Sequence, residues 1–129
     1  MRRGEIWLAR LNPNVGSEIG KVRPVLILLA QRYLNAGSPV VIAAPLTTQY
    51  WPGMAALRIP VSARGRLLKD SFVVLEQMRA LDRSRFDDAR LAGEPTVPGL
   101  VHALVPAIRQ MVVVPLWHPF SCTPTPDPL

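Results

Sequence analysis

The sequence has almost no cysteine, since Cys122 is its single one, and the chain therefore cannot form an internal disulfide. This usage favours the cytoplasm as the compartment. No apolar run approaches the roughly 20 residues that span a bilayer, so we expect a soluble protein without a membrane partner. Glu5 and Arg10 interrupt the apolar stretch that a signal peptide would need, and we predict that the N-terminus is a first strand retained in the mature protein.

Metal ligands are equally sparse. His102 and His118 are far apart in the sequence, and no ligand spacing such as H-x-x-x-H or C-x-x-C occurs. We therefore expect no metal site and no cofactor. His102 is a weaker candidate for an acid-base residue than for a flank or interface residue, because it follows Leu100 and Val101 on a predicted helix.

Acidic residues are outnumbered: nine Asp and Glu stand against fifteen Lys and Arg, which gives a formal net charge of +6. Thirteen of the fifteen bases are arginine. Because arginine is planar, permanently charged and able to bind phosphate or carboxylate in a fork, the excess favours a polyanionic partner or an acidic protein partner. A solvated surface encoded by a GC-biased genome is an equally open interpretation.

Length and hydrophobic content predict one domain. The chain has 129 residues, of which 49% are hydrophobic, and a single core typically holds about 100 to 150 residues. We place this domain at residues 1–114 and expect a proline-rich tail, extended or disordered, at residues 115–129.

Five apolar or β-branched runs of strand length alternate with turn clusters. They cover residues 5–11, 25–30, 40–46, 55–61 and 71–78. This many short strands predict a mainly β fold, built as a small antiparallel barrel or sandwich. The second and third runs are apolar on both faces, so we expect central strands covered by the barrel interior on one side and by a helix or a partner chain on the other.

The pattern changes after residue 82. D-R-S-R-F-D-D-A-R suits a short exposed helical turn followed by a loop, and from Val97 onward apolar residues recur three and four apart, as on one face of a helix. Thr96 is a suitable N-cap for it. Pro106 lies inside this helix at a cost of about 3 kcal/mol, so we expect a kink or an early end between His102 and Pro106.

The stretch V-G-S-E-I-G-K-V-R-P-V-L-I-L-L, residues 15–29, sets a polar loop against a buried strand. Proline is tolerated at the first residue of a strand and holds the residue before it extended, so Arg23 has little backbone freedom. The preceding loop, residues 16–20, contains two glycines and Glu18. A rigid cation beside a mobile acidic loop is a candidate phosphate site, although an Arg-Glu pair that closes a hairpin would use the same residues.

Hydroxyl and aromatic side chains follow the third run. Thr47 and Thr48 leave the apolar strand, and Tyr50 and Trp51 come next, a combination that single-stranded RNA recognition uses. Strand-edge threonines and packing aromatics are the alternative interpretation. The fifth run adds the polar residues Lys69, Asp70, Ser71, Glu76, Gln77 and Arg79.

Taken in order, the segments R-G-E-I-W-L, L-N-P, G-S-E-I-G-K-V-R-P-V-L, A-P-L-T-T, K-D-S-F-V and L-E-Q-M-R-A-L-D resemble the MazF/PemK family of toxin endoribonucleases from bacterial toxin-antitoxin systems. The resemblance covers about residues 2–86. It implies an SH3-like barrel with appended helices, a homodimer, metal-independent cleavage of single-stranded RNA, and an antitoxin whose acidic C-terminal segment covers the RNA groove.

By position, the resemblance implies that Arg23 and Thr47 form the catalytic pair and that Glu18 assists as an acid-base group. It makes Ser17 and Thr48 neighbouring substrate contacts. The further candidate RNA-binding residues are Lys21, Trp51, Lys69, Gln77 and Arg79.

Such cleavage is feasible without a metal, because the 2′-OH of RNA is a nucleophile already beside the phosphorus. We expect Arg23 to stabilise the charged phosphorane and to help the leaving group, Thr47 to orient a phosphate oxygen, and Glu18 to take the 2′-OH proton. The products would be a 2′,3′-cyclic phosphate and a 5′-OH. Some family members carry another catalytic arginine where this chain has Val74, which leaves any mechanism that needs it open.

Two other functions are open from the residues alone. One is a non-catalytic binder, since the related CcdB toxins use this fold to poison DNA gyrase. The other is a degenerate family member that binds an antitoxin after losing cleavage. Arg23 and Thr47 in their matched positions favour the enzyme.

Overall fold

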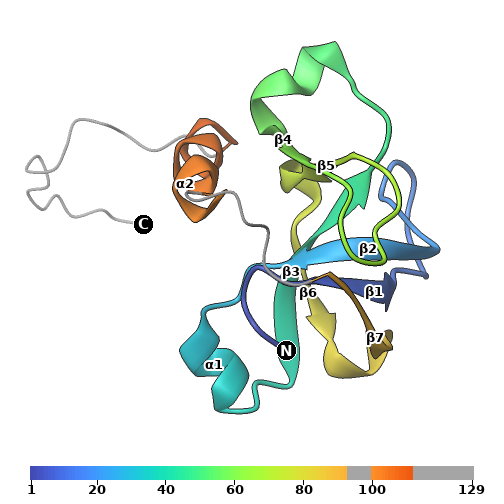
Figure 1. Ribbon diagram of the computed structural model, residues 1–129, viewed down its shortest axis with the longest axis vertical. Helices are drawn as coiled ribbons and strands as arrows, with labels where there is room; N and C mark the ends of the chain where they lie inside the picture. The colour runs from blue at the N-terminus through green and yellow to red at the C-terminus, as the bar shows by residue number, and fades with distance from the viewer. Residues whose placement is uncertain (93–99, 112–129) are drawn as a thin grey trace, which may run out of the picture.

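A computed structural model describes residues 1–92 and 100–111 of the chain, and seven strands and two α-helices lie within these ranges (Figure 1). The strands are β1 (Ile6–Arg10), β2 (Val22–Ile27), β3 (Val40–Thr47), β4 (Arg58–Val61), β5 (Ser71–Val74), β6 (Arg79–Asp82) and β7 (Phe86–Ala92). The helices are α1 (Gln31–Asn35) and α2 (Leu100–Met111), and three short 3-10 helices are η1 (Pro52–Leu57), η2 (Leu75–Gln77) and η3 (Arg83–Arg85). No helix of the described residues is long and apolar enough to cross a bilayer.

The strands form one curled antiparallel sheet in the order β4-β5-β3-β2-β1-β7. The long strand β3 pairs with β6 along its first half and with β5 at its end, which bends the sheet. The two ends of this order lie close together in space. The backbone N–H of Arg66, in the loop that joins β4 to β5, donates to the carbonyl of Leu91 in β7 at 2.7 Å. The predicted mainly β, barrel-like fold and the central position of the second and third runs are confirmed.

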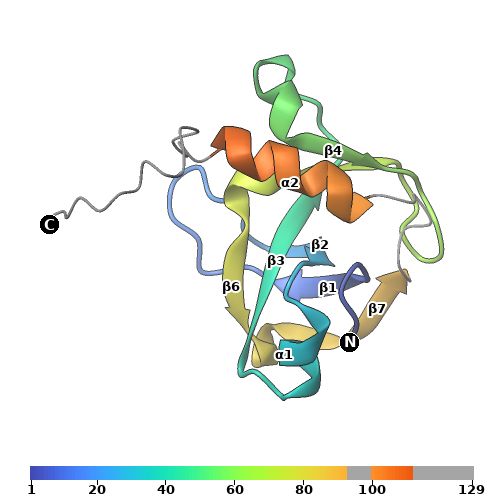
Figure 2. The same ribbon diagram turned by 90° about the vertical axis from the view of Figure 1, so that its left-hand side faces the viewer.

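Alternate residues of the central strands supply two different cores, as a period of two requires. The barrel interior consists of Ile6, Leu26, Ala44, Leu46, Val61, Leu67, Val73 and Ala92. The opposite face of the sheet consists of Ala9, Leu11, Val25, Ile27, Leu34, Val41, Ala43 and Leu81, with Leu34 contributed by α1. Both helices lie on one side of the sheet, to the left in Figure 1 and toward the viewer in Figure 2.

Helix α2 continues through Pro106 to Met111, so the predicted early end is wrong. Leu104 and Ala107 are buried against Leu75, whereas Pro106 is exposed on the other face. The proline ring therefore faces solvent, and burial of the apolar stripe offsets the hydrogen bond that proline removes. The predicted N-cap Thr96, the start at Val97 and the tail at residues 115–129 lie outside the described residues.

Three local expectations are wrong. Residues 55–57 belong to η1 and not to a strand, because Pro52 and Gly53 begin a helical turn that ends at Leu57. The fifth run is interrupted by η2 and resumes as β6. The loop expected after η3 is strand β7, which pairs with β1.

Candidate active site

Strand register brings Arg23 and Thr47 together. β2 and β3 pair antiparallel, the pairing ends with Val25 opposite Pro45, and Arg23 and Thr47 each lie two residues beyond that last pair at the same end of the two strands. Both side chains line one open pocket with a volume of about 290 Å³. The catalytic pair implied by the family resemblance is therefore close in space, although its members are 24 positions apart in the chain (47 − 23).

The sequence predicts Pro24 as the first residue of a strand, but it is the third residue of β2. Its missing N–H costs little there, because the recorded pairing of β2 with β3 begins only at the next residue, Val25. Arg23 pairs with Ala9 on the other side, so its backbone is held by β1 while its side chain is exposed. The geometry agrees with the expected restriction of the Arg23 backbone.

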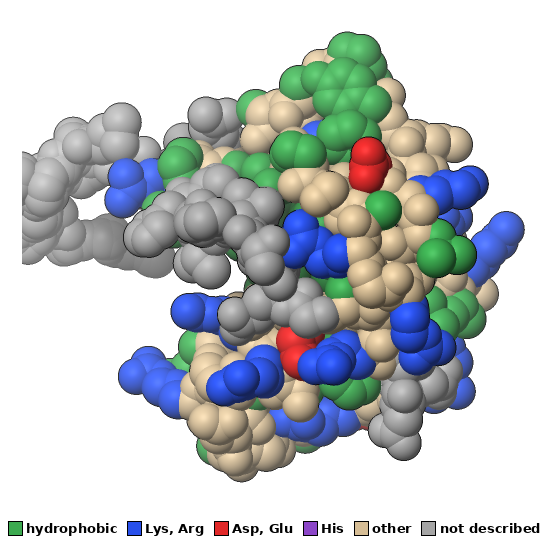
Figure 3. Space-filling view, viewed as in Figure 1, with side chains coloured by type: hydrophobic (Ala, Val, Ile, Leu, Met, Phe, Trp, Pro, Cys, Tyr) green, Lys and Arg blue, Asp and Glu red, His purple; other side chains and the backbone are tan. Residues whose placement is uncertain are grey.

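The pocket is cationic. Its walls come from the start of β2, the end of β3, the β4–β5 loop and β7, and the lining residues are Arg23, Pro24, Leu46, Thr47, Thr48, Arg66, Leu67, Leu68, Lys69, Ser71 and Leu91. Three of them are basic, and none of the described lining residues is acidic. Figure 3 shows Lys and Arg side chains gathered along the right-hand and lower parts of this view. Such a pocket attracts anions.

The hydroxyl of Thr47 is oriented by its own turn. Its Oγ1 accepts the backbone N–H of Gln49 at 3.1 Å, which leaves the hydroxyl proton free to be donated. Thr48 is exposed beside it and lines the same pocket. Two adjacent hydroxyls at a strand end can thus donate to an anion bound near Arg23.

Glu18 lies in the β1–β2 loop and is not part of the Arg23–Thr47 pocket. Its Oε1 accepts the backbone N–H of Val15 at 2.8 Å, and its own N–H donates to the Val15 carbonyl at 3.1 Å, which closes a tight turn. Gly16 has a φ of 56° in this turn, a value that favours glycine. No ion pair between Glu18 and Arg23 forms in the described part of the chain, so a hairpin-closing pair is not found there.

Gln77 anchors this loop to the sheet. Its Oε1 accepts the N–H of Ile19 at 2.6 Å, and its Nε2 donates to the carbonyl of Ser17 at 3.2 Å. The loop that the sequence predicts to be mobile is therefore fastened at two consecutive peptide groups. Ser17 itself is exposed and meets Gln77 through its backbone.

A second pocket, of about 300 Å³, lies next to the first along β3 and contains Glu18. Its lining residues are Leu11, Glu18, Ile19, Pro45, Glu76, Gln77, Met78 and Arg79. Glu76 is bound by Arg58 at 2.5 Å, which neutralises its charge, while Arg79 adds a cation. Because Pro45 and Thr47 belong to the same strand, the two pockets share the end of β3.

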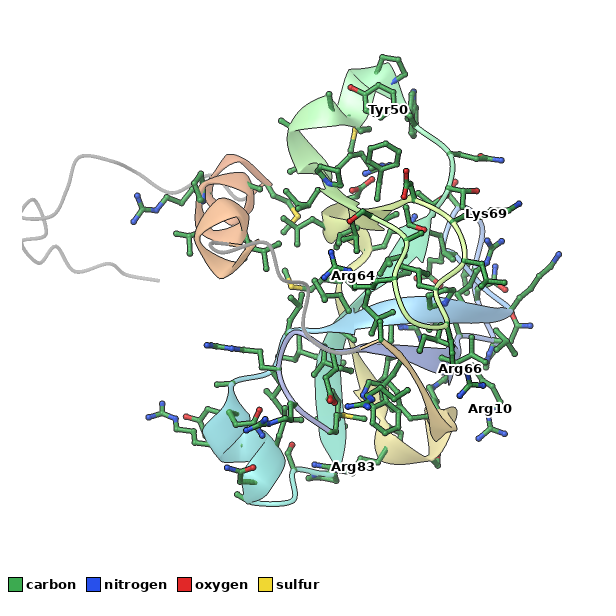
Figure 4. The ribbon with its side chains drawn as sticks, viewed as in Figure 1. Arg10, Tyr50, Arg64, Arg66, Lys69 and Arg83 are labelled. Carbon is green, nitrogen blue, oxygen red and sulfur yellow. The ribbon has the colours of Figure 1, made fainter. Side chains whose placement is uncertain are left out.

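Two other candidates lie outside both pockets. Lys21 is exposed with a φ of 67°, and its N–H donates to Oδ1 of Asn12 at 2.9 Å, so its backbone forms a turn. Trp51 is 63% exposed. Its neighbour Tyr50 packs against Phe72 with ring centroids 5.2 Å apart, at the upper end of the molecule in Figure 4.

Arg66 lines the pocket of Arg23 and Thr47 but was missed from the sequence. Its only signal is a cation after Gly65 in A-R-G-R, one of the turn clusters that lie between the strand-length runs. Val74, where some family members carry an arginine, is 1% exposed and packs in the core. The described residues contain no group of three His, Cys, Asp or Glu side chains that could hold a metal ion.

A family model described as the PemK-like, MazF-like toxin of type II toxin-antitoxin systems matches residues 2–104. The chain belongs to this family. It is 38% identical over 89 residues to the endoribonuclease MazF of Staphylococcus saprophyticus, covering 68% of this chain and 73% of that protein. It is 37% identical over 89 residues to the endoribonuclease EndoA of Bacillus subtilis, covering 68% of this chain and 76% of the relative.

Solved structures share the fold. The Mycobacterium tuberculosis toxin MazF-mt6 superposes with a TM-score of 0.66 at 24% identity, over 83% of this chain and 94% of its own. MazF of Deinococcus radiodurans gives a TM-score of 0.64 at 23% identity, over 86% and 94%. An endoribonuclease in complex with its cognate antitoxin, from a mycobacterial species, gives 0.65 at 20% identity, over 89% and 97%. The expected toxin fold is confirmed.

Proposed function

We propose that this chain is the toxin of a type II toxin-antitoxin system and cleaves single-stranded RNA without a metal ion. The observation that carries the proposal is the cationic pocket in which Arg23 and Thr47 meet. A pocket with three bases and no described carboxylate suits a phosphodiester. The relatives named endoribonucleases support RNA as the substrate.

In the proposed reaction the 2′-oxygen attacks the adjacent phosphorus, a new O–P bond forms, and the bond from phosphorus to the 5′-oxygen breaks. Arg23 stabilises the charge on the equatorial oxygens of the phosphorane, since a guanidinium stays protonated throughout. Thr47 donates a hydrogen bond from its hydroxyl to one phosphate oxygen and orients it. The leaving 5′-oxygen takes a proton from water, because Arg23 keeps its own, and the products are a 2′,3′-cyclic phosphate and a 5′-OH.

Glu18 takes the 2′-OH proton in this proposal, through the neighbouring pocket along β3. Its Oε1 is engaged with Val15, while Oε2 has no hydrogen bond to a described residue. A carboxylate oxygen is thus available for the nucleophile of a strand that runs past both pockets. We propose that seven further residues contact this RNA strand or lie beside it: Ser17, Thr48, Lys21, Trp51, Lys69, Gln77 and Arg79.

The cationic pocket also suggests which protein partner the chain binds. An antitoxin with an acidic C-terminal segment would compete with RNA for the cationic pocket, and we propose a homodimer in the cytoplasm, where messenger RNA is found. The folded toxin domain is proposed to span residues 1–114. The mycobacterial neighbour in complex with its cognate antitoxin is an example of such an assembly in a protein of the same fold.

The test is to incubate the purified chain with a long single-stranded RNA in EDTA and to map the 5′ ends. We expect cuts at a short recurring sequence, 5′-OH products, and loss of cutting in Arg23→Ala with an unchanged circular dichroism spectrum. Binding should weaken with salt with a slope of about −0.7 per phosphate contacted. Inhibition of gyrase without RNA cleavage would assign the chain to the CcdB-like alternative, and binding of an acidic peptide alone would make it a degenerate member.

A further inference from the structure

We propose that Arg66 is a second phosphate-binding guanidinium of the active site, acting on the reacting phosphate from the β4–β5 loop, in the same pocket as Arg23. The inference rests on the proposed function and adds to it a residue that lies outside the family-like motifs. Arg66 and Arg23 line the same pocket, one from the β4–β5 loop and the other from β2. Both side chains are exposed to an incoming ligand.

The charge of Arg66 is not used elsewhere in the described structure. The two ion pairs recorded there join Arg58 to Glu76 and Arg90 to Glu5. Asp70, the nearest carboxylate in sequence, accepts the N–H of Ala63 at 2.8 Å and closes the base of the loop. Arg66 therefore keeps its hydrogen-bonding capacity for a ligand.

The backbone beneath Arg66 is fixed. Arg64 and Leu67 form a two-way bridge, with N–H to carbonyl distances of 3.0 and 2.8 Å, and Leu67 is buried. The Arg66 N–H is bound to Leu91 at 2.7 Å. A side chain presented from a fixed turn loses less conformational entropy on binding than one on a loose loop.

Gly65 explains how this turn reaches β7. Its φ is 54°, and a Cβ at this position would lie 2.8 Å from the carbonyl oxygen of Leu91. Only glycine allows both the left-handed backbone and this close approach. The glycine thus holds Arg66 beside the pocket.

The basic side chains of the β4–β5 loop differ in the side of the molecule on which they lie. Figure 4 shows Arg66 and Lys69 on the side away from α2, whereas Arg64 lies on the side toward it. Arg64 binds Ser62 through its guanidinium, at 3.1 Å to Oγ, and does not line the pocket. Ser71 donates its hydroxyl to the Lys69 carbonyl at 3.0 Å, which fixes the other end of the loop.

A second guanidinium would stabilise the transition state of RNA cleavage more than the bound substrate. A phosphodiester carries one negative charge and the phosphorane formed from it carries two, so a second cation stabilises the transition state more than the ground state. Buried Val74 cannot supply that charge, which some family members place on this strand. Arg66 supplies it from the β4–β5 loop.

The experiment compares Arg66→Ala, Arg66→Lys and the same-loop control Arg64→Ala on a short RNA that contains one mapped cut site. We expect kcat to fall about 100-fold in Arg66→Ala with KM changed by less than about fivefold, because removing one transition-state donor typically costs that much. Arg66→Lys should recover part of the rate, since it keeps the charge without the fork. Arg64→Ala loses the same charge and should stay within about twofold of the wild type.

Added methylguanidinium, at concentrations that leave the thermal transition unchanged, should restore cutting by Arg66→Ala but not by Arg23→Lys. A rate equal to that of Arg64→Ala, or a change in KM alone, would overturn the proposal. Normal cutting together with weaker binding of a polyglutamate peptide would also overturn it and assign Arg66 to an acidic protein partner. A wild-type chain that does not cut RNA refutes the proposed function and this inference together, whereas an active wild type with an active Arg66→Ala refutes this inference alone.

Discussion

Gln77 binds the N–H of Ile19 at 2.6 Å and thereby connects the β1–β2 loop to a segment 58 positions later in the chain. The same amide donates to the carbonyl of Ser17 at 3.2 Å, so both hydrogen-bonding groups of the side chain are used. Glu18 lies between the two anchored residues. Its position therefore depends on Gln77 and on the loop's own turn.

Substitution Gln77→Ala should release this loop. We expect the free energy of unfolding to fall by about 1 to 2 kcal/mol, because two hydrogen bonds are lost and the half-buried N–H of Ile19 loses its partner, whereas the exposed Ser17 carbonyl can bind water. RNA cleavage should fall by at least tenfold through misplacement of Glu18. Urea denaturation and cleavage rates at a temperature far below the transition separate the two effects, and full activity in a folded Gln77→Ala protein would contradict the role of the anchor.

Arg58 and Glu76 form a partly buried ion pair, with side chains 6% and 22% exposed and a separation of 2.5 Å. Substitution Glu76→Ala leaves the Arg58 charge buried, and within the described residues the Arg58 Nε already has no hydrogen-bond partner. We expect a loss of about 3 kcal/mol in the free energy of unfolding.

Replacing both partners is the matched control for that pair. The double variant Arg58→Met/Glu76→Leu removes both charges and should recover most of the lost free energy of unfolding. Chemical denaturation of Arg58→Met, Glu76→Leu and the double variant gives the coupling energy. Equal losses in the single and double variants would show that the pair contributes only packing.

Glu5 is a buried carboxylate at the start of β1. Burial raises its pKa, but hydrogen bonds from the Trp7 indole, the Arg2 backbone and Arg90 together outweigh burial and hold its pKa below the usual 4.5. A lowered folded pKa contributes stability that is present above the unfolded pKa and is lost as pH falls through the folded pKa. Folding should therefore weaken below about pH 4.5 partly through this group.

The variant Glu5→Gln keeps the shape of the side chain and removes the titration. It should be less stable than the wild type at pH 7, and the difference should shrink as the pH is lowered from 5 to 3. Thermal unfolding monitored by circular dichroism across this range gives the comparison. A constant difference between the two proteins at all pH values would exclude Glu5 as a source of the acid sensitivity.

Most of the sheet could be predicted because its central strands are apolar on both faces. The runs that became β2 and β3 were recognised in this way, and the barrel followed from their number and spacing. Strand β7 was missed because F-D-D-A-R-L-A is polar and becomes a strand only by pairing with β1. For helix α2 a kink or an early end was expected, because the sequence does not reveal that Pro106 faces solvent.

The residues of the candidate site could be predicted from the sequence only in part. Arg23, Thr47 and Glu18 were named from the family-like motifs, but their relative positions depend on the register Val25 to Pro45 and on the Gln77 anchor, neither of which local sequence encodes. Arg66 was missed because a cation in a turn looks the same whether the turn is free or bound to a distant strand. Its hydrogen bond to Leu91 is a tertiary contact.

Thr47 offers a test of the hydroxyl alone. Its Oγ1 accepts the N–H of Gln49 at 3.1 Å, and the residue lines the pocket with Arg23, so its hydroxyl can donate to a phosphate that binds there. Substitution Thr47→Val keeps the shape and removes the hydroxyl. We expect kcat to fall about 100-fold, with KM less affected, because one oriented donor to the developing charge is lost.

The matched variant Thr47→Ser keeps the hydroxyl and its bond to Gln49, and should retain cleavage within about fivefold of the wild type. Single-turnover rates with a mapped RNA substrate compare the two, and circular dichroism checks that each is folded. If the valine variant cuts as fast as the serine variant, the hydroxyl of Thr47 does not act on the phosphate. Arg23 would then act without Thr47, and a neighbouring donor such as Thr48 would have to orient the substrate.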